Sequence, residues 1–337
     1  MIENPFLGVG LNDVSLAEIP MPSVDATAPN KLLERCPEAG PTPLVALGSF
    51  AGAGSVFVKD ERDRMGLGSF KALGAAYVIA CEAAAGRAEG QTFVCASAGN
   101  HGLSVAAGAQ AFKAKAVIYL SRTVPEAFAE RLRARGAEVR RVDGSYEESM
   151  GAAAKAAVVE GFKLLSDSSW PGYTEYPFRL MEGYLAMADE AAEAMAEPPT
   201  HIFLQAGVGG LAAACAAYFR KVWGDGPKII VVEPEAAPAL KDCIAAGKFV
   251  TAVGPESCMG RLDCKEASLI ALNGLARDAN AFMTITEEES VAALPLLADV
   301  GLQTTPSGGA GLAGLMGLAP LGPEARVLCI VSEGPEG

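Results

Sequence analysis

Short apolar runs recur along most of the chain, and longer Ala-rich stretches separate them. Each run has six to eight residues rich in Val, Ile, Leu or Phe, such as SVFVKD and KIIVVEP. Buried strands of parallel sheets have this composition, and the stretches between the runs are long enough for helices. The pattern therefore predicts an α/β protein with open, mainly parallel sheets. The predicted strands cover residues 55–60, 92–97, 114–121, 136–143, 162–167, 200–206, 228–234 and 325–332.

Residues 114–143 have the form of a compact strand–helix–strand unit. Pro125 opens its helix, and Gly136 ends that helix before the second strand begins. We expect this unit to belong to a smaller lobe that moves separately, and the Pro-rich first 40 residues to follow the surface. The predicted division is a large lobe made of residues 1–90 and 165–337 and a small mobile lobe made of residues 91–164.

Charge and hydropathy exclude several kinds of partner. The chain has 40 acidic and 27 basic residues, a formal net charge of −13, and no run rich in Lys and Arg. Nucleic acids and anionic membranes bind basic patches, so neither is expected as a partner. The first residues do not form a secretory signal, and the apolar stretch 308–322 is too short to span a bilayer, so it predicts a buried core helix. We expect a cytoplasmic protein.

Eight scattered cysteines, none in a CxxC pair, predict free and mostly buried thiols in a reducing cytoplasm. Cys258 and Cys264 are close in sequence, but the chain has two histidines, so a zinc site is not expected.

Lys71 is the first candidate for chemistry. It follows a glycine-rich loop, stands beside Phe70, and precedes the apolar helical stretch AAYVIACEAAAG. A helix start and partial burial both disfavour an ammonium ion, and this predicts a nucleophilic amine suited to a Schiff base. The alternative is an ordinary solvated lysine near a helix start.

Two further glycine motifs each follow a predicted strand and open a helix. In SAGNHG (97–102), small residues let backbone N–H groups approach an anion, and Asn100 can bind a ring hydroxyl. In QAGVGGLA (205–212), the N–H groups of residues 207–211 and the helix dipole form a phosphate cradle. It lacks the third glycine of a dinucleotide fingerprint and the lysine of a Walker motif. The alternative for each motif is a structural turn, capped in the first by Ser97 and Asn100.

One cofactor carries an aldehyde, a phenolic oxygen and a phosphate, and so matches the lysine and both loops: pyridoxal 5′-phosphate. On these motifs the chain resembles fold-type II pyridoxal-phosphate enzymes of the tryptophan-synthase β superfamily, and most of all the diaminopropionate ammonia-lyases. The resemblance covers about four-fifths of the chain. It is carried by PTPLVAL (41–47), the Lys71 and glycine motifs, DSSWPGYTEYP (167–177), RLMEGYLAMADEA (179–191), VVEPEAAPAL (231–240), MGRLDCKEASLIAL (259–272) and VSEGPEG (331–337).

The resemblance implies a role for each matching position. Lys71 would hold the cofactor covalently and then remove the Cα proton of the substrate. Asp167 would orient or protonate the β-group, although a helix or turn cap is the alternative. Ser332 would face the pyridine nitrogen and leave it unprotonated, which favours β-elimination over transamination or racemisation. The implied cofactor-binding residues are Phe70, Asn100, Gly207, Val208, Gly209, Gly210, Leu211 and Ser332, and the implied substrate-binding residues are Ser97, Ala98, Gly99 and His101.

Two positions depart from the family. Close relatives carry an aspartate where this chain has Ala98, and that carboxylate would be the base for a D-substrate. We therefore predict an L-preference and little racemase activity. Glu233 lacks the second acid of the metal cluster found in racemases and dehydratases, so no metal site is expected. His101 and His201 are not expected to be metal ligands either.

These observations predict an ammonia-lyase that converts 2,3-diaminopropionate to pyruvate and ammonia. One alternative is a lyase acting on L-serine, L-threonine or another 3-substituted alanine. A second is a non-catalytic protein that binds a phosphate ligand, although the intact Lys71 disfavours it. The family implies a homodimer, and no regulatory domain is expected after VSEG.

Overall fold

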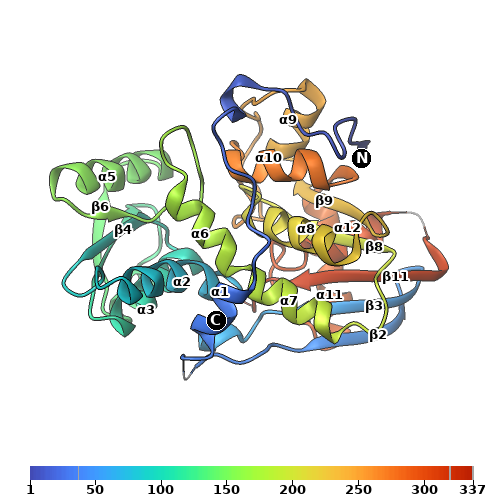
Figure 1. Cartoon of the computed structure of the whole chain (residues 1–337), viewed down its shortest axis with the longest axis horizontal. Coiled ribbons are helices and arrows are strands. Elements are labelled where there is room, and N and C mark those ends of the chain that lie inside the picture. Colours follow the sequence, from blue (N-terminus) through green and yellow to red (C-terminus); the bar gives the residue numbers. More distant parts are fainter. Residues whose placement is uncertain (37, 319, 336–337) are drawn as a thin grey trace.

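The computed structural model describes residues 1–36, 38–318 and 320–335. Its strands form two sheets, one of seven strands in the order β1-β10-β9-β8-β11-β3-β2 and one of four in the order β6-β5-β4-β7. Helices cover both sheets (Figure 1). Within the described residues, β1 and β2 pair antiparallel with their neighbours and the other strand pairs are parallel. The predicted α/β class with mainly parallel sheets is confirmed.

The strands are β1 (Ile2–Glu3), β2 (Leu44–Phe50), β3 (Ala53–Asp60), β4 (Thr92–Ala96), β5 (Lys115–Ser121), β6 (Glu138–Val142), β7 (Lys163–Leu164), β8 (His201–Gln205), β9 (Lys228–Pro234), β10 (Ala281–Ile285) and β11 (Gly322–Val331). The helices are η1 (Val14–Leu16), α1 (Thr27–Leu33), η2 (Arg64–Gly66), α2 (Lys71–Ala84), α3 (Asn100–Ala111), α4 (Glu126–Ala134), α5 (Tyr146–Val159), α6 (Glu175–Gly183), α7 (Leu185–Ala194), α8 (Gly210–Trp223), α9 (Ala239–Ala246), α10 (Leu269–Asp278), α11 (Glu287–Asp299) and α12 (Ala310–Gly317).

All eight predicted strands are present, but the apolar pattern did not predict three others. The edge strands β1 and β2 were not predicted because β1 has two residues and the apolar run of β2, LVAL, is short and partly exposed. The run AFMTI of β10 is buried, but it was not predicted as a strand. The predicted strand 162–167 is a regular strand over β7 alone, and Leu165 continues it with one bond from its N–H to the Val94 carbonyl, 2.8 Å.

Each sheet is a buried layer between helices because its side chains alternate between two apolar faces. In the four-stranded sheet, Phe93 and Cys95 belong to the main core with α3, whereas Val94 and Val117 pack with Ala153 of α5 on the other face. In the seven-stranded sheet, α8 and α10 cover one face, and α11 and α12 cover the other. The predicted core helix within 308–322 is α12, whose residues up to Leu315 are buried.

The first 36 residues follow the surface, as predicted. Figure 1 shows this blue segment running from α9 and α10, past α6, to α1. It is not entirely loop, because β1 pairs with β10 and the short helices η1 and α1 interrupt it. Among the described residues, no helix combines the length and apolar character that a membrane crossing requires.

All eight cysteines are free thiols. Cys258 is an exception to the predicted burial, because it is exposed.

The loops that follow β3, β4, β7, β8 and β11 all carry a motif identified from the sequence. In open parallel sheets, ligands bind at the carboxyl ends of the strands. The fold therefore directs five separated segments toward the edge where a site is expected.

Candidate active site

Lys71 is the first residue of α2, as the sequence predicted. The loop before it is attached to the carboxyl end of β11. The Phe70 N–H donates to the Ser332 carbonyl (3.0 Å), and Ser69 forms an isolated antiparallel bridge with Glu333. Lys71 and Ser332 are therefore neighbours in space although 261 positions separate them in the sequence.

The Lys71 ammonium donates to the Asp167 carboxylate with an Nζ–Oδ2 distance of 2.6 Å. Both side chains are partly buried, with exposed fractions of 21% and 25%. The segment after β7 is fixed by Tyr173, whose hydroxyl donates to the Leu164 carbonyl and accepts the Ser166 N–H. Lys71 is thus not a solvated lysine, and Asp167 pairs with it rather than serving as a cap.

The prediction of a lowered Lys71 pKa is wrong for this arrangement. Burial is the largest single influence and lowers the Lys71 pKa, but Asp167, Tyr184 and Cys264 together outweigh it, and the net pKa is raised. Burial likewise raises the Asp167 pKa, but Lys71, His101 and hydrogen bonding together outweigh it, so the net pKa is lowered and this carboxyl stays ionised. The sequence did not reveal the raised Lys71 pKa because Asp167, which pairs with Lys71, lies 96 positions away.

The loop 97–101 joins β4 to α3. Gly99 is the N-cap of α3, and its N–H donates to the Ser97 hydroxyl (3.3 Å). Ala98 is partly buried and packs against the main core. His101 is buried and its Nε2 bonds to the Leu165 carbonyl (2.8 Å), which directs the ring toward the protein interior. A substrate role for these residues stays a prediction.

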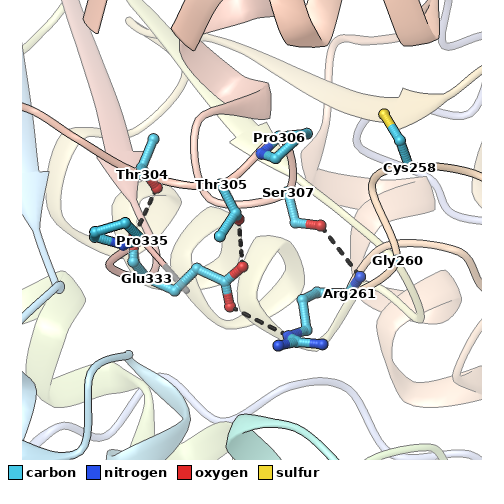
Figure 2. Close-up of a pocket in the computed structure, with 9 residues that line it drawn as sticks. All are labelled: Cys258, Gly260, Arg261, Thr304, Thr305, Pro306, Ser307, Glu333 and Pro335. Atoms are coloured by element: carbon cyan, nitrogen blue, oxygen red, sulfur yellow. Dashed lines mark hydrogen bonds and ion pairs between the residues drawn. The ribbon is translucent and has the colours of Figure 1, made fainter. Parts of the chain in front are cut away.

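Asn100 donates from its Nδ2 to Glu333, a residue that the sequence analysis did not select. The buried Glu333 carboxylate also accepts the Thr305 hydroxyl and faces Arg261, with a nitrogen–oxygen distance of 3.6 Å (Figure 2). A cavity of about 330 Å³ lies beside these three side chains. A second cavity of similar volume shares them and reaches Asn100. Glu333 directly follows Ser332, a predicted cofactor-binding residue, and this adjacency is the sequence feature that could have identified it.

The loop 207–211 joins β8 to α8 and has the form expected of a phosphate cradle. Gly209 caps α8 with a φ of 96°, a conformation that favours glycine. A Cβ on Gly207 would lie 3.0 Å from the Leu262 Cα and 3.1 Å from the Cys264 sulfur, which is closer than ordinary contact. The first N–H groups of α8 have no partners within the helix and are available to an anion. Gly210 and Leu211 begin the helix, and Val208 accepts the Ser268 N–H (3.0 Å).

Two further side chains face Lys71 and were not selected from the sequence. Tyr184 lies in the quoted stretch RLMEGYLAMADEA and is almost fully buried. Cys264 lies in DCKEAS, and burial raises the pKa of its thiol to about 12. Both interact electrostatically with the Lys71 ammonium. Membership of a quoted motif was the only sequence signal for either residue.

Pyridoxal phosphate fits these residues. The glycine loop leaves no room for side chains that would fill a phosphate site, and two buried polar atoms near Lys71 lack a partner within the described residues. These are the Tyr184 hydroxyl and the His101 Nδ1. Residues 207–211 would hold the phosphate, Asn100 and Ser332 would face the ring, and Lys71 would bind the aldehyde.

Glu233 lies at the start of a helix and bonds to its backbone. Its carboxylate accepts the N–H groups of Leu240 (2.7 Å) and Lys241 (2.8 Å) at the start of α9. Burial raises the Glu233 pKa to about 8. Within the part of the chain that the structure describes, no group of three or more His, Cys, Asp or Glu side chains could hold a metal.

Comparisons with known proteins agree with this geometry. A family model described as pyridoxal-phosphate dependent enzyme matches residues 36–333. The chain is 35% identical over 280 residues to diaminopropionate ammonia-lyase of Escherichia coli (strain K12), which covers 75% of this chain and 69% of that protein. It is 30% identical over 297 residues to L-serine dehydratase/L-threonine deaminase of Mus musculus, covering 86% and 84%.

A crystal structure of the Escherichia coli diaminopropionate ammonia lyase, in complex with an aminoacrylate-PLP azomethine reaction intermediate, matches with a TM-score of 0.87. The match has 28% sequence identity and covers 99% of this chain and 93% of that one. The match extends over both sheets. The chain therefore belongs to the pyridoxal-phosphate dependent enzymes of fold type II, within their ammonia-lyase group, and acts on an amino acid.

Proposed function

We propose that this chain removes ammonia from L-2,3-diaminopropionate by β-elimination. With one water, the reaction gives pyruvate and two molecules of ammonia. When bound, pyridoxal phosphate withdraws electrons from the substrate and makes its Cα proton removable. The observation that carries the proposal is the partly open Lys71–Asp167 pair, whose Nζ–Oδ2 distance is 2.6 Å.

In this proposal Lys71 has two tasks. It holds the cofactor before the substrate arrives, and its freed amine then takes the Cα proton. Loop 97–101 holds the substrate carboxylate with backbone N–H groups at the start of α3. The proton that Lys71 takes stays beside Asp167, and the β-ammonium group leaves as neutral ammonia without needing a further proton.

The charge of Asp167 supports a diamine rather than a hydroxy amino acid. Because Lys71 keeps this carboxyl ionised, it attracts a β-ammonium group but has no proton to give to a hydroxyl. The second candidate is a lyase acting on L-serine or L-threonine. It is supported by the 30% identity to the mouse dehydratase and by Ala98, which departs from the ammonia-lyase pattern.

An assay of pyruvate and ammonia tests the proposal. The substrates are L- and D-diaminopropionate, L-serine, L-threonine and β-chloroalanine. We expect the fastest turnover with L-diaminopropionate and two ammonia per pyruvate, whereas a hydroxy amino acid releases one. Because position 98 lacks the carboxylate of close relatives, Ala98→Asp is expected to raise D-diaminopropionate turnover. Equal turnover of both enantiomers by the unmodified protein would contradict the L-preference.

We also infer a division into lobes of residues 1–90 with 165–337 and 91–164. The separate four-stranded sheet supports it, and the Asn100–Glu333 bond would link the two lobes. The family further suggests a homodimer, which sedimentation of the purified protein tests. The free thiols fit a cytoplasmic location.

A further inference from the structure

Tyr184 contacts the two helices that begin at the site, α2 and α8. In the sequence it is the residue between α6 and α7, and it is 1% exposed. Its ring centroid lies 4.8 Å from that of Phe70. A Cβ on Gly74 would come within 2.7 Å of the Tyr184 Cε1, and a Cβ on Gly210 within 3.7 Å of its Cε2. The ring therefore touches the first turn of α2 and the first residue of α8.

The hydroxyl of this ring is an unexplained polar group. It is buried and has no hydrogen-bond partner within the described residues. Leaving a hydroxyl buried and unbonded costs free energy, and packing alone would have been satisfied by phenylalanine. Burial raises the Tyr184 pKa, so the phenol stays neutral and is not a proton donor at ordinary pH. The Tyr184 ring and the Lys71 Nζ border the same Phe70 ring, the Nζ 5.3 Å from its centroid, so Tyr184 belongs to the surroundings of the reacting amine.

The role of the Tyr184 hydroxyl follows from the number of N–H groups on the Lys71 amine. A neutral lysine amine has two N–H groups and one lone pair. Asp167 accepts one N–H, at 2.6 Å. If a second acceptor holds the other N–H, the lone pair has a single remaining direction, toward the substrate. After proton transfer, the same two acceptors hold the ammonium, and the third N–H is the proton taken from Cα.

We propose that Tyr184 is a positioning residue that acts through Lys71: its hydroxyl oxygen accepts the second N–H of the freed amine and directs the lone pair to the Cα proton. This inference rests on the proposed role of Lys71 and deepens it. No electron transfer or co-reactant is required, because the step moves one proton from Cα to the amine.

The test compares Tyr184→Phe with a matched control, Tyr218→Phe. Both variants remove one hydroxyl from a buried ring, but the Tyr218 hydroxyl bonds to Asp189 on α7 instead of facing Lys71. The first readout needs no cofactor. Acetic anhydride labels neutral amines in the cofactor-free protein at pH 9, and peptide mass spectrometry compares Lys71 with the exposed Lys113. The second readout is kcat and KM for L-diaminopropionate.

Among the described residues, the titratable groups that interact electrostatically with Lys71 include Asp167, Tyr184, Cys264, His101 and Tyr146, and the variant changes one of them. Because the hydroxyl helps to hold the ammonium, its loss is expected to lower the Lys71 pKa. Labelling should rise by about threefold to tenfold, which corresponds to one hydrogen bond. We expect kcat to fall by about tenfold with KM within about twofold, because the lone pair is no longer directed. Tyr218→Phe should match the unmodified protein in both readouts.

Two results would overturn the inference. The first is unchanged Lys71 labelling and kcat in Tyr184→Phe. The second is a loss of activity that accompanies a lowered melting temperature without any change in labelling, since that describes a structural residue. If the unmodified holoenzyme is colourless and releases no pyruvate, the proposed function fails instead, and the inference fails with it.

Discussion

Two lysines of this chain form ion pairs of equal length in different surroundings. Lys59 donates to Glu190 at 2.6 Å and also to the Thr42 carbonyl at 2.6 Å, and its side chain is 1% exposed. Arg64 completes that cluster with two carboxylates, Glu61 and Glu190. Around Lys71 the ion pair is also 2.6 Å long, but the site is partly open.

The difference lies in the neighbours rather than in the ion pair. The described polar atoms of the Lys59 cluster bond to one another, so that cluster has no capacity left for a ligand. Beside Lys71, the Tyr184 hydroxyl and the His101 Nδ1 are buried without partners in the described structure. Unsatisfied polar atoms next to a glycine cradle therefore distinguish a site from a structural cluster.

Matched substitutions of the two lysines give the largest effects and test this comparison. Lys71→Met is expected to lower kcat by about 10⁴-fold, because it removes both the cofactor link and the base. The free energy of unfolding should change little, because water can reach the remaining Asp167. Pyruvate formation and chemical denaturation of the cofactor-free protein measure the two effects. Retained turnover would show that Lys71 is not the reacting amine.

Lys59→Met should give the opposite result. It removes the buried ammonium and leaves the partly buried Glu190 carboxylate with one partner fewer, and breaking a buried ion pair costs about 3–5 kcal/mol of stability. The folded fraction should keep its visible absorbance and its KM. Urea denaturation measures the loss, and a stability within 1 kcal/mol of the unmodified protein would contradict the structural role, on the ~3–5 kcal/mol scale of such pairs.

Asp167→Asn is the smallest of the three changes and separates charge from shape. The amide keeps the volume but loses the negative charge that raises the Lys71 pKa, so the Lys71 pKa should fall. The acid limb of kcat, which reports the freed amine in the substrate complex, is then expected to move to lower pH, and kcat to fall by about 10²-fold. The pH profile measures this. Asp143→Asn, which changes an exposed carboxylate paired with Arg122, should leave the profile unchanged.

The sequence predicted the layout well where burial is continuous. Parallel strands such as β8 and β9 are apolar on both faces, so their composition identifies them without any knowledge of the fold. The apolar run of β2, LVAL, is short and partly exposed, and this strand was not predicted. Glycine loops were also predictable, because a φ of 96° at Gly209 restricts the residue that can stand there.

The electrostatics of the site were not predictable in the same way. The Lys71 pKa depends on Asp167, which follows β7 at the edge of the small sheet, whereas Lys71 follows β3 of the large sheet. Glu333 meets Asn100 across 233 positions of sequence. Neither pairing leaves a local pattern, because a charged side chain looks the same in sequence whichever partner the fold supplies. Only the resemblance to a known family pointed to Asp167.

Reduction of the holoenzyme with borohydride, followed by peptide mass spectrometry, tests the central claim most directly. Reduction fixes the cofactor to whichever lysine holds it. We predict one pyridoxyl group, on Lys71, and none on Lys59, whose buried ammonium already bonds to Thr42 and Glu190. A label on another lysine, or a colourless protein that takes up no cofactor, would contradict the account.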